Sequence, residues 1–285
     1  MLIPHSSSVT RLLGCLLASL TLLTASSALP DTPNLIVILC DDLGYGDVQS
    51  LNPEHGKIPT PSIDRLASEG MTFTDAHAGA SVCTPTRYGL LTGRYSWRTR
   101  LQRGVVKGFE PNLIAADRPT VASLLQAAGY HTAMIGKWHL NFEYADANSG
   151  ELLARREHPD GAPVGARIVD GPTTRGFDVF HGFHHSRHME AVIENDRVTA
   201  HDDVVNMLPR LTREAVAYLD QRAAEPTTAP FFLYLALNSP HTPHVPAPEW
   251  QGRSGLGVYG DFVMQTDASV GAVLAALERN RLSED

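Results

Sequence analysis

Three short, strongly apolar runs separated by stretches with helical spacing constrain this chain of 285 residues more than any other feature. The runs cover residues 34–40, 132–135 and 231–237. Continuous apolar runs of this length, with β-branched and aromatic residues, are typical of strands buried on both faces. Strands that alternate with helices indicate a mostly parallel sheet sandwiched between helices. The predicted fold class is therefore α/β.

Helix signals fill the segments between these strands. A capping residue or proline at the start and glycine at the end mark the shorter helices, and a 3.6-residue apolar period marks the longer ones. Helices are predicted over residues 59–70, 119–129, 203–223 and 262–282, with another beginning at Cys83. Residues 71–76 alternate in polarity and are predicted as a strand, whereas residues 141–175 are predicted as a surface insertion.

A polar cluster follows each of the three strands. Asp41 and Asp42 follow the first, Lys137 and His139 follow the second, and His241 follows the third. Because ligands of open α/β sheets bind outside the carboxyl ends of the strands, we predict one site at this edge. Two adjacent carboxylates favour a hard cation such as Ca²⁺ or Mg²⁺. The alternative is that one Asp caps the next turn and the other is solvated.

A second cluster lies at the start of the helix that begins at Cys83. Pro85 suits the first turn, because it has no N–H group to leave unpaired. Cys83 then lies where free N–H groups and the helix dipole favour an anion, and Arg87 follows one turn later on the same face. The alternative is a buried free thiol beside a surface arginine.

The run from Cys83 to Arg94 resembles the signature of the sulfatases, which begins Cys-x-Pro-x-Arg and ends Gly-Arg. The segments around Asp41 and Lys137 resemble other conserved segments of that family, and the resemblance covers approximately residues 33–285. It implies an alkaline-phosphatase/sulfatase-like fold and the hydrolysis of sulfate esters, with a sulfated small molecule or glycan as substrate.

The resemblance also implies a nucleophile and a metal site. Cys83 would be oxidised to formylglycine by a maturation enzyme, either formylglycine-generating or anaerobic, and the hydrated aldehyde would attack sulfur with Arg87 stabilising it. The metal ligands would be Asp41, Asp42 and residue 83, and the cation would be Ca²⁺ or, alternatively, Mg²⁺.

The remaining roles implied by the resemblance concern substrate binding and proton transfer. Lys137 would bind the sulfate group, and His139 would take a proton from the second hydroxyl of residue 83. His241 would contact the substrate and protonate the leaving oxygen, with His244 as the alternative. Spacing would make Ser186 a further substrate-binding residue.

One histidine cluster lies outside these motifs. It consists of His181, His184, His185 and His188. The spacing is not that of a zinc site, so a role in lining the substrate pocket is the favoured interpretation.

Composition and targeting signals bound the remaining possibilities. The net charge of −8 does not suit a nucleic-acid partner. Residues 1–28 have the charge, apolar core and small residues of a signal peptide, which predicts an exported protein, periplasmic or secreted, without a stable membrane anchor. Of the three cysteines, Cys40 and Cys83 would remain after cleavage, and we predict no disulfide between them.

The resemblance further predicts that the catalytic domain, residues 29–285, is incomplete at its C-terminus. Sulfatases carry a later Asp-Asn-Gly segment with two more metal ligands, and no such tripeptide occurs in the sequence. Two alternatives to a sulfatase therefore stay open. One is a phosphonate or phosphate monoester hydrolase of the same superfamily, and the other is an inactive binding relic.

Overall fold

The computed structural model describes residues 32–159, 161–226 and 229–283, and residues 33–285 form one compact unit. The predicted signal peptide lies outside the described residues. The strands are β1 (Leu35–Asp41), β2 (His131–Lys137), β3 (Tyr144–Ala145), β4 (Arg167–Ile168), β5 (Val179–Phe183), β6 (Ala191–Glu194), β7 (Arg197–His201) and β8 (Phe231–Pro240). The longer helices are α1 (Pro61–Glu69), α2 (Cys83–Thr92), α3 (Val121–Ala127), α4 (Met207–Ala224) and α5 (Gly257–Arg279).

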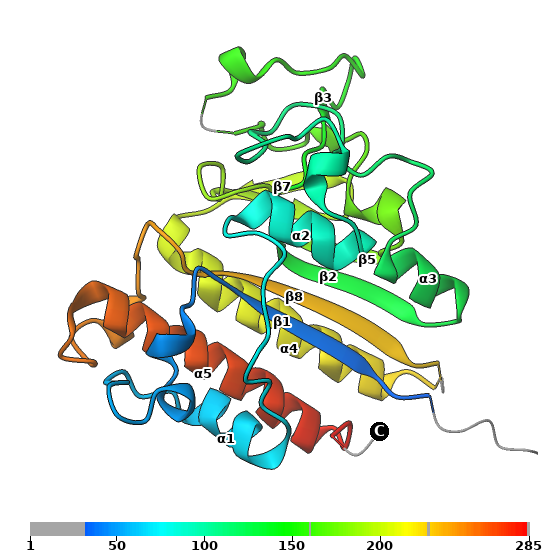
Figure 1. Cartoon of the computed structure of the whole chain (residues 1–285). Coiled ribbons are helices and arrows are strands. Elements are labelled where there is room, and N and C mark those ends of the chain that lie inside the picture. The colour runs from blue at the N-terminus through cyan, green and yellow to red at the C-terminus, as the bar shows by residue number, and fades with distance from the viewer. Residues whose placement is uncertain (1–31, 160, 227–228, 284–285) are drawn as a thin grey trace, which may run out of the picture. The chain divides into compact units, whose positions relative to one another are not determined.

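The strands form one mixed sheet in the order β1-β8-β2-β5-β6-β7-β4-β3 (Figure 1). The first four strands run parallel, and every later neighbour pair is antiparallel. The three strands expected from the sequence are β1, β8 and β2, which are direct neighbours. The α/β prediction is confirmed, and the sheet also has an antiparallel half that the sequence analysis did not anticipate.

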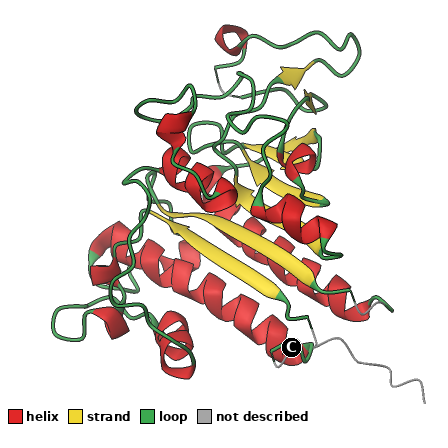
Figure 2. Ribbon diagram, turned by 45° about the vertical axis from the view of Figure 1, so that its right-hand side comes forward, coloured by secondary structure: helices red, strands yellow, loops and turns green. Residues whose placement is uncertain are grey.

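Helices cover both faces of the parallel half (Figure 2). The alternation of side chains along β8 shows the two layers, because successive residues of a strand point to opposite faces. Phe232, Tyr234 and Ala236 pack in one core with residues of α2 and α3. Phe231, Leu233, Leu235 and Leu237 pack in the other core with residues of α4 and α5. A strand buried on both faces must be apolar throughout, which explains the continuous run in the sequence.

The helix ends follow from local sequence chemistry. Thr120 caps α3 in a capping box with Ser123, and Gly93 ends α2 with a left-handed backbone (φ 64°). Pro61 is the first residue of α1, where its missing N–H group costs no hydrogen bond. The helices predicted over 59–70 and 119–129 thus occur close to their capping signals, whereas α5 begins at Gly257, before the predicted start at residue 262.

Three local predictions need correction. Residues 71–76 form no strand, and Met71 and Phe73 are exposed, because that segment pairs with no strand in the described part of the chain. Residues 141–175 are not simply a surface insertion, since they contribute β3 and β4 and bury Phe142 and Tyr144 in the core. β1 is an edge strand that is only half-buried, with Val37 36% exposed.

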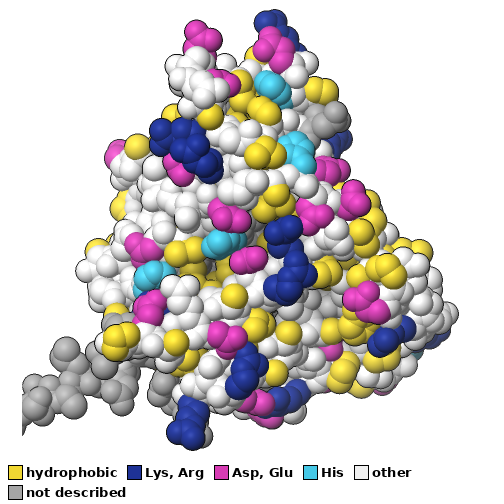
Figure 3. All heavy atoms as spheres, turned by 180° about the vertical axis from the view of Figure 1, so that it is seen from behind, with side chains coloured by type: hydrophobic (Ala, Val, Ile, Leu, Met, Phe, Trp, Pro, Cys, Tyr) yellow, Lys and Arg dark blue, Asp and Glu magenta, His cyan; other side chains and the backbone are white. Residues whose placement is uncertain are grey.

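The surface carries mixed charge. On the face seen in Figure 3, acidic and basic side chains are interspersed rather than gathered into a field of one sign. Among the described residues, no helix is both long and apolar enough to span a bilayer.

Candidate active site

The N-terminus of α2 places Cys83 at the carboxyl edge of the parallel strands. Val82 is the extended N-cap residue and Cys83 is the first helical residue. The hydroxyl group of Thr84 donates a hydrogen bond of 2.9 Å to the carbonyl oxygen of His139, just beyond β2. The α2 residue that follows Cys83 is therefore tied directly to the end of the central strand.

A buried group of three charges lies beneath this helix start. The Nζ of Lys137 lies 2.5 Å from Oδ2 of Asp41, and the guanidinium of Arg87 lies 3.3 Å from Oδ1 of Asp41. Arg87 also donates a 2.8 Å hydrogen bond to the carbonyl oxygen of Lys137. All three side chains are at most 4% exposed. Two cations share one carboxylate, so the group has an excess of positive charge that favours an anion nearby.

Asp42 and His241 lie toward solvent from this group. Asp42 has a left-handed backbone (φ 63°) and its side chain is 60% exposed, in contrast to the buried Asp41. The Nε2 of His241 lies 3.6 Å from Oδ2 of Asp42. The hydroxyl group of Ser186 lies 3.2 Å from Nζ of Lys137 and 3.3 Å from Nδ1 of His241. Ser186 therefore connects the side chains that follow β2 and β8.

His139 presents an unoccupied proton acceptor. Its Nε2 lies 3.1 Å from the carbonyl oxygen of Val106, which requires that this nitrogen carry the proton. Its Nδ1 is buried and has no hydrogen-bond partner within the described ranges. Burial, followed by the charges of Lys137, His185 and Arg87, lowers the pKa of His139 to about 2. The ring is therefore neutral at physiological pH, and its Nδ1 carries no proton.

Two hollows meet at Cys83. One, of about 330 Å³, is bordered by Asp41, Asp42, Cys83 and Arg87 among others. The other, of about 250 Å³, is lined by Cys83, Val105, Val106, Lys107, Lys137, His139, Arg155, His185, Ser186, Arg187 and His241. We call the second hollow the substrate pocket. All eight candidate residues from the sequence therefore line one or other of two adjoining hollows.

The remaining histidines divide between the site and other places. His185 lines the substrate pocket, and its ring stacks with that of His188. His184 is fully buried behind them, whereas His181 lies near Glu214 in a different hollow. His244 packs against Tyr259 and does not line the substrate pocket, which favours His241 of the two alternatives.

The sequence analysis missed three basic residues of the pocket wall. Lys107, Arg155 and Arg187 line it but lie in loops or short turns that follow no strand motif. No local pattern marks them, because only the folding of distant loops brings them together.

The carboxylates suit a hard cation in kind but not in number. Ca²⁺ and Mg²⁺ prefer oxygen ligands, which Asp41 and Asp42 provide. Both oxygens of Asp41 are, however, engaged by Lys137 and Arg87. In the described part of the chain, no group of three or more His, Cys, Asp or Glu residues is arranged to hold a metal ion. These residues alone therefore do not form a complete Ca²⁺ site.

Basic side chains, histidines and a cysteine-headed helix lie together at the carboxyl ends of the parallel strands, an arrangement suited to binding an anion. The sulfatase family model matches residues 33–285. The chain therefore belongs to the sulfatase family.

Individual relatives agree with this assignment. An N-acetylgalactosamine-6-O-sulfatase of Bacteroides thetaiotaomicron is 29% identical, over 89% of this chain and 57% of the relative. Human arylsulfatase A is 32% identical, over 90% of this chain and 50% of the relative. The chain thus spans about half the length of these curated relatives.

Solved structures show the same fold. A structure from work on glycosaminoglycan metabolism by Bacteroides thetaiotaomicron has a TM-score of 0.74 and 27% identity, and the match covers 89% of this chain and 60% of that one. The phosphonate monoester hydrolase of Agrobacterium radiobacter has a TM-score of 0.56 and 16% identity, over 89% of this chain and 61% of that one, which shows a shared fold alone.

Proposed function

We propose that this chain hydrolyses sulfate esters, in the manner of arylsulfatases and with sulfated carbohydrates as substrates, through formylglycine derived from Cys83. One observation carries the proposal. Cys83 is the first residue of α2 and shares a pocket with Lys137 and His139, at the end of β2, and with His241, which follows β8. A nucleophile, a buried cation and two histidines around one cavity are the parts that a transfer of an anionic group requires.

Formylglycine would supply a hydrated aldehyde, whose one hydroxyl is a nucleophile and whose second hydroxyl allows sulfate to be released. The protein's own residues prepare the surroundings of that group. Lys137 and Arg87, which we call the floor cations, provide the excess positive charge that attracts the sulfate group. His139 lines the same pocket as residue 83 and is the proposed acceptor of a proton from its second hydroxyl.

His241 is the proposed general acid. Its ring lines the pocket, with Nε2 facing Asp42 and Nδ1 within 3.3 Å of Ser186. An imidazole that lines the pocket beside the bound ester is positioned to donate a proton to the leaving oxygen. Ser186 then orients the ring and the Lys137 ammonium group toward the same substrate group.

A divalent cation belongs to this proposal, with Ca²⁺ favoured and Mg²⁺ as the alternative. Asp41, Asp42 and residue 83 would contribute to holding it, and the bound cation would neutralise charge on the sulfate oxygens. Because Asp41 is already paired with two cationic side chains, we expect weak Ca²⁺ binding by the 285-residue chain. Calorimetric titration would measure it, and micromolar affinity would show that the paired state of Asp41 does not limit binding.

Two cellular requirements follow from the proposal. Oxidation of Cys83 needs a maturation enzyme as a partner. The signal-peptide pattern of residues 1–28 supports export to the periplasm or the medium.

The test is to produce the protein together with a formylglycine-generating enzyme. Mass spectrometry of the peptide containing residue 83 should show the aldehyde, and sulfate should be released from an aryl sulfate and from N-acetylgalactosamine 6-sulfate. An intact thiol under these conditions would refute the nucleophile. Faster turnover of aryl phosphates or phosphonates would favour the phosphoester or phosphonate reading, and modified protein without turnover of any ester would indicate a binding relic.

A further inference from the structure

The wall of the substrate pocket has a charge imbalance that hydrolysis of one sulfate group does not require. Four of its residues are cations, namely Lys107, Lys137, Arg155 and Arg187, and no Asp or Glu is among the described residues that line it. The chain as a whole carries a net charge of −8. The concentration of positive charge is therefore local to the pocket.

Three of these cations differ from Lys137 in their surroundings. Lys107 and Arg187 are exposed and Arg155 is half-buried, whereas Lys137 is fully buried against Asp41. Within residues 32–159, 161–226 and 229–283, the side chains of Lys107, Arg155 and Arg187 form no ion pair and no side-chain hydrogen bond. We call these three residues the rim. Their charges are hydrated and are available to an anionic ligand.

The backbone that carries the rim is held in place. Nε2 of His185 lies 3.0 Å from the carbonyl oxygen of Lys107, and Nδ1 of the same ring accepts a 3.1 Å hydrogen bond from the N–H of Arg187. One imidazole thus links two rim residues that are far apart in sequence. Burial and the neighbouring His188 lower the pKa of His185 to about 4, so the neutral form that makes both bonds persists at physiological pH.

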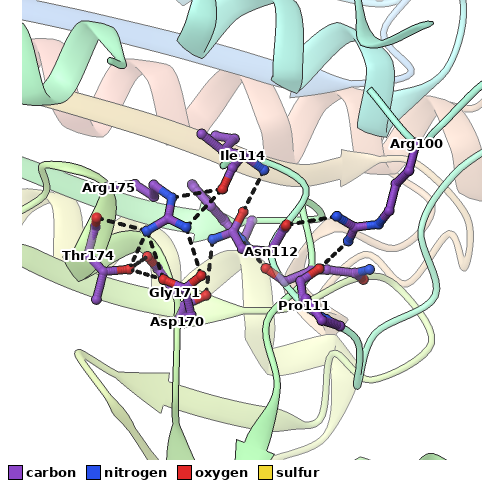
Figure 4. A network of polar contacts seen from close by, with 10 residues as sticks. Arg100, Pro111, Asn112, Ile114, Asp170, Gly171, Thr174 and Arg175 are labelled. Atoms are coloured by element: carbon purple, nitrogen blue, oxygen red, sulfur yellow. Dashed lines mark hydrogen bonds and ion pairs between the residues drawn. The ribbon is translucent and has the colours of Figure 1, made fainter. Parts of the chain in front are cut away.

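The loop that carries Lys107 is also anchored on its other side (Figure 4). Arg100 donates to the carbonyl oxygens of Pro111 and Asn112. Arg175 donates to the carbonyl oxygen of Ile114 and pairs with Asp170. A fixed loop presents its lysine at a defined place, so less conformational freedom is lost when a ligand binds.

We infer that the rim binds a second anionic group of the substrate, a sulfate or carboxylate on the same sugar or the next one. This inference rests on the proposed function, in which the pocket floor takes the sulfate that is removed. Binding at the rim would define the substrate class as glycans that carry at least two negative charges within the span of one pocket. Lys107, Arg155 and Arg187 are accordingly specificity-determining residues, and none of them takes part in proton transfer.

The experiment measures binding to Cys83→Ala protein by calorimetry, so that turnover does not interfere. The probes are N-acetylgalactosamine 6-sulfate, its 4,6-disulfate, and the disaccharide in which a uronic acid is joined to the 6-sulfated sugar. We expect at least one of the two doubly charged probes to bind about tenfold more tightly than the singly charged one at low salt. The gain should shrink toward zero at 0.5 M NaCl, because the rim charges are exposed.

Charge variants of the rim complete the test. Arg155→Gln/Arg187→Gln should abolish the gain and leave affinity for N-acetylgalactosamine 6-sulfate within twofold. The matched control is Arg213→Gln, an exposed arginine of α4 away from the pocket, which should preserve the gain. Equal affinity for all three probes, or a gain that survives in the rim variant, overturns the inference while the proposed function stands. Failure of every sulfated probe to bind overturns both.

Discussion

The floor and the rim of the substrate pocket present positive charge in opposite ways. Of the two floor cations, Lys137 lines the substrate pocket and Arg87 borders the adjoining hollow, and both are buried and paired with Asp41. On the rim, Lys107, Arg155 and Arg187 belong to loops and turns and remain unpaired in the described part of the chain. Buried, paired charges are fixed before a ligand arrives and are costly to disturb, whereas exposed charges cost little to keep or remove. The floor is therefore suited to chemistry, and the rim to the choice of substrate.

The strongest test of the floor is Cys83→Ala. It should abolish sulfate release entirely, because no other residue of the pocket can supply the proposed nucleophile. Stability should change by less than about 1 kcal/mol, since the side chain is only half-buried and heads its helix. Sulfate release and thermal melting of the same preparation measure both effects. Residual turnover above background would mean that another residue is the nucleophile.

The next test concerns the carboxylate that the two floor cations share. Asp41→Asn keeps the shape of the side chain but leaves Arg87 and Lys137 without a counter-charge. We expect a loss of about 3–5 kcal/mol of unfolding free energy, as when one partner of a buried ion pair is removed. Urea denaturation in the presence of EDTA measures this loss without a contribution from bound cations.

The neighbouring residue provides the matched control for that change. Asp42→Asn alters the same atoms at a side chain that is 60% exposed and lies 3.6 Å from Nε2 of His241. Asparagine also tolerates the left-handed backbone at this position. The expected loss is below about 1 kcal/mol. Equal losses for the two variants would contradict the distinction between buried and exposed charge.

A smaller effect is expected from the buried histidines behind the pocket. Burial lowers the pKa of His184 well below its usual value, and those of His139 and His185 to about 2 and about 4. A depressed histidine pKa means that the unfolded chain binds protons below pH 6.5 that the folded chain does not. Stability is thus fully present above pH 6.5 and is lost as the pH falls, by up to about 1.4 kcal/mol per pH unit for each ring.

His184→Phe tests this relation, because neither nitrogen of His184 has a hydrogen-bond partner among the described residues. The variant should lose about 2 kcal/mol less stability than the wild type between pH 7.5 and pH 5. His55→Phe, at an exposed histidine, should retain the wild-type dependence. Urea denaturation at the two pH values gives the comparison, and parallel curves for the wild type and His184→Phe would disprove it.

The smallest effect on stability belongs to the rim. Arg155→Gln/Arg187→Gln should change the free energy of unfolding by no more than about 0.5 kcal/mol, because neither side chain has an ionic partner among the residues that the structure describes. A denaturation curve at pH 7 is sufficient. A loss as large as that of Asp41→Asn would mean that the rim is part of the structural framework and not a surface for ligands.

The sequence alone predicted those strands and helices whose conformation is determined by residues close together in the chain. The continuous apolar runs predicted β2 and β8 because strands covered on both faces cannot alternate, and a similar run predicted β1, although that strand is a half-buried edge strand. The Cys83–Arg87 spacing predicted a helix start with both side chains on one face. Ligands bind at the carboxyl ends of parallel strands, and this rule predicted that Asp41, Lys137 and His241 belong to one site.

Other features depended on tertiary structure because their causes are long-range. Residues 71–76 have the alternation of a strand, but a strand also needs a neighbour, and sequence does not show which segment lies beside it. The pairing of Asp41 with Lys137 depended on the register of β1, β8 and β2, and its pairing with Arg87 depended on the packing of α2 beside those strands. The rim came from three separate segments, whose meeting at one pocket leaves no periodicity or spacing in the chain.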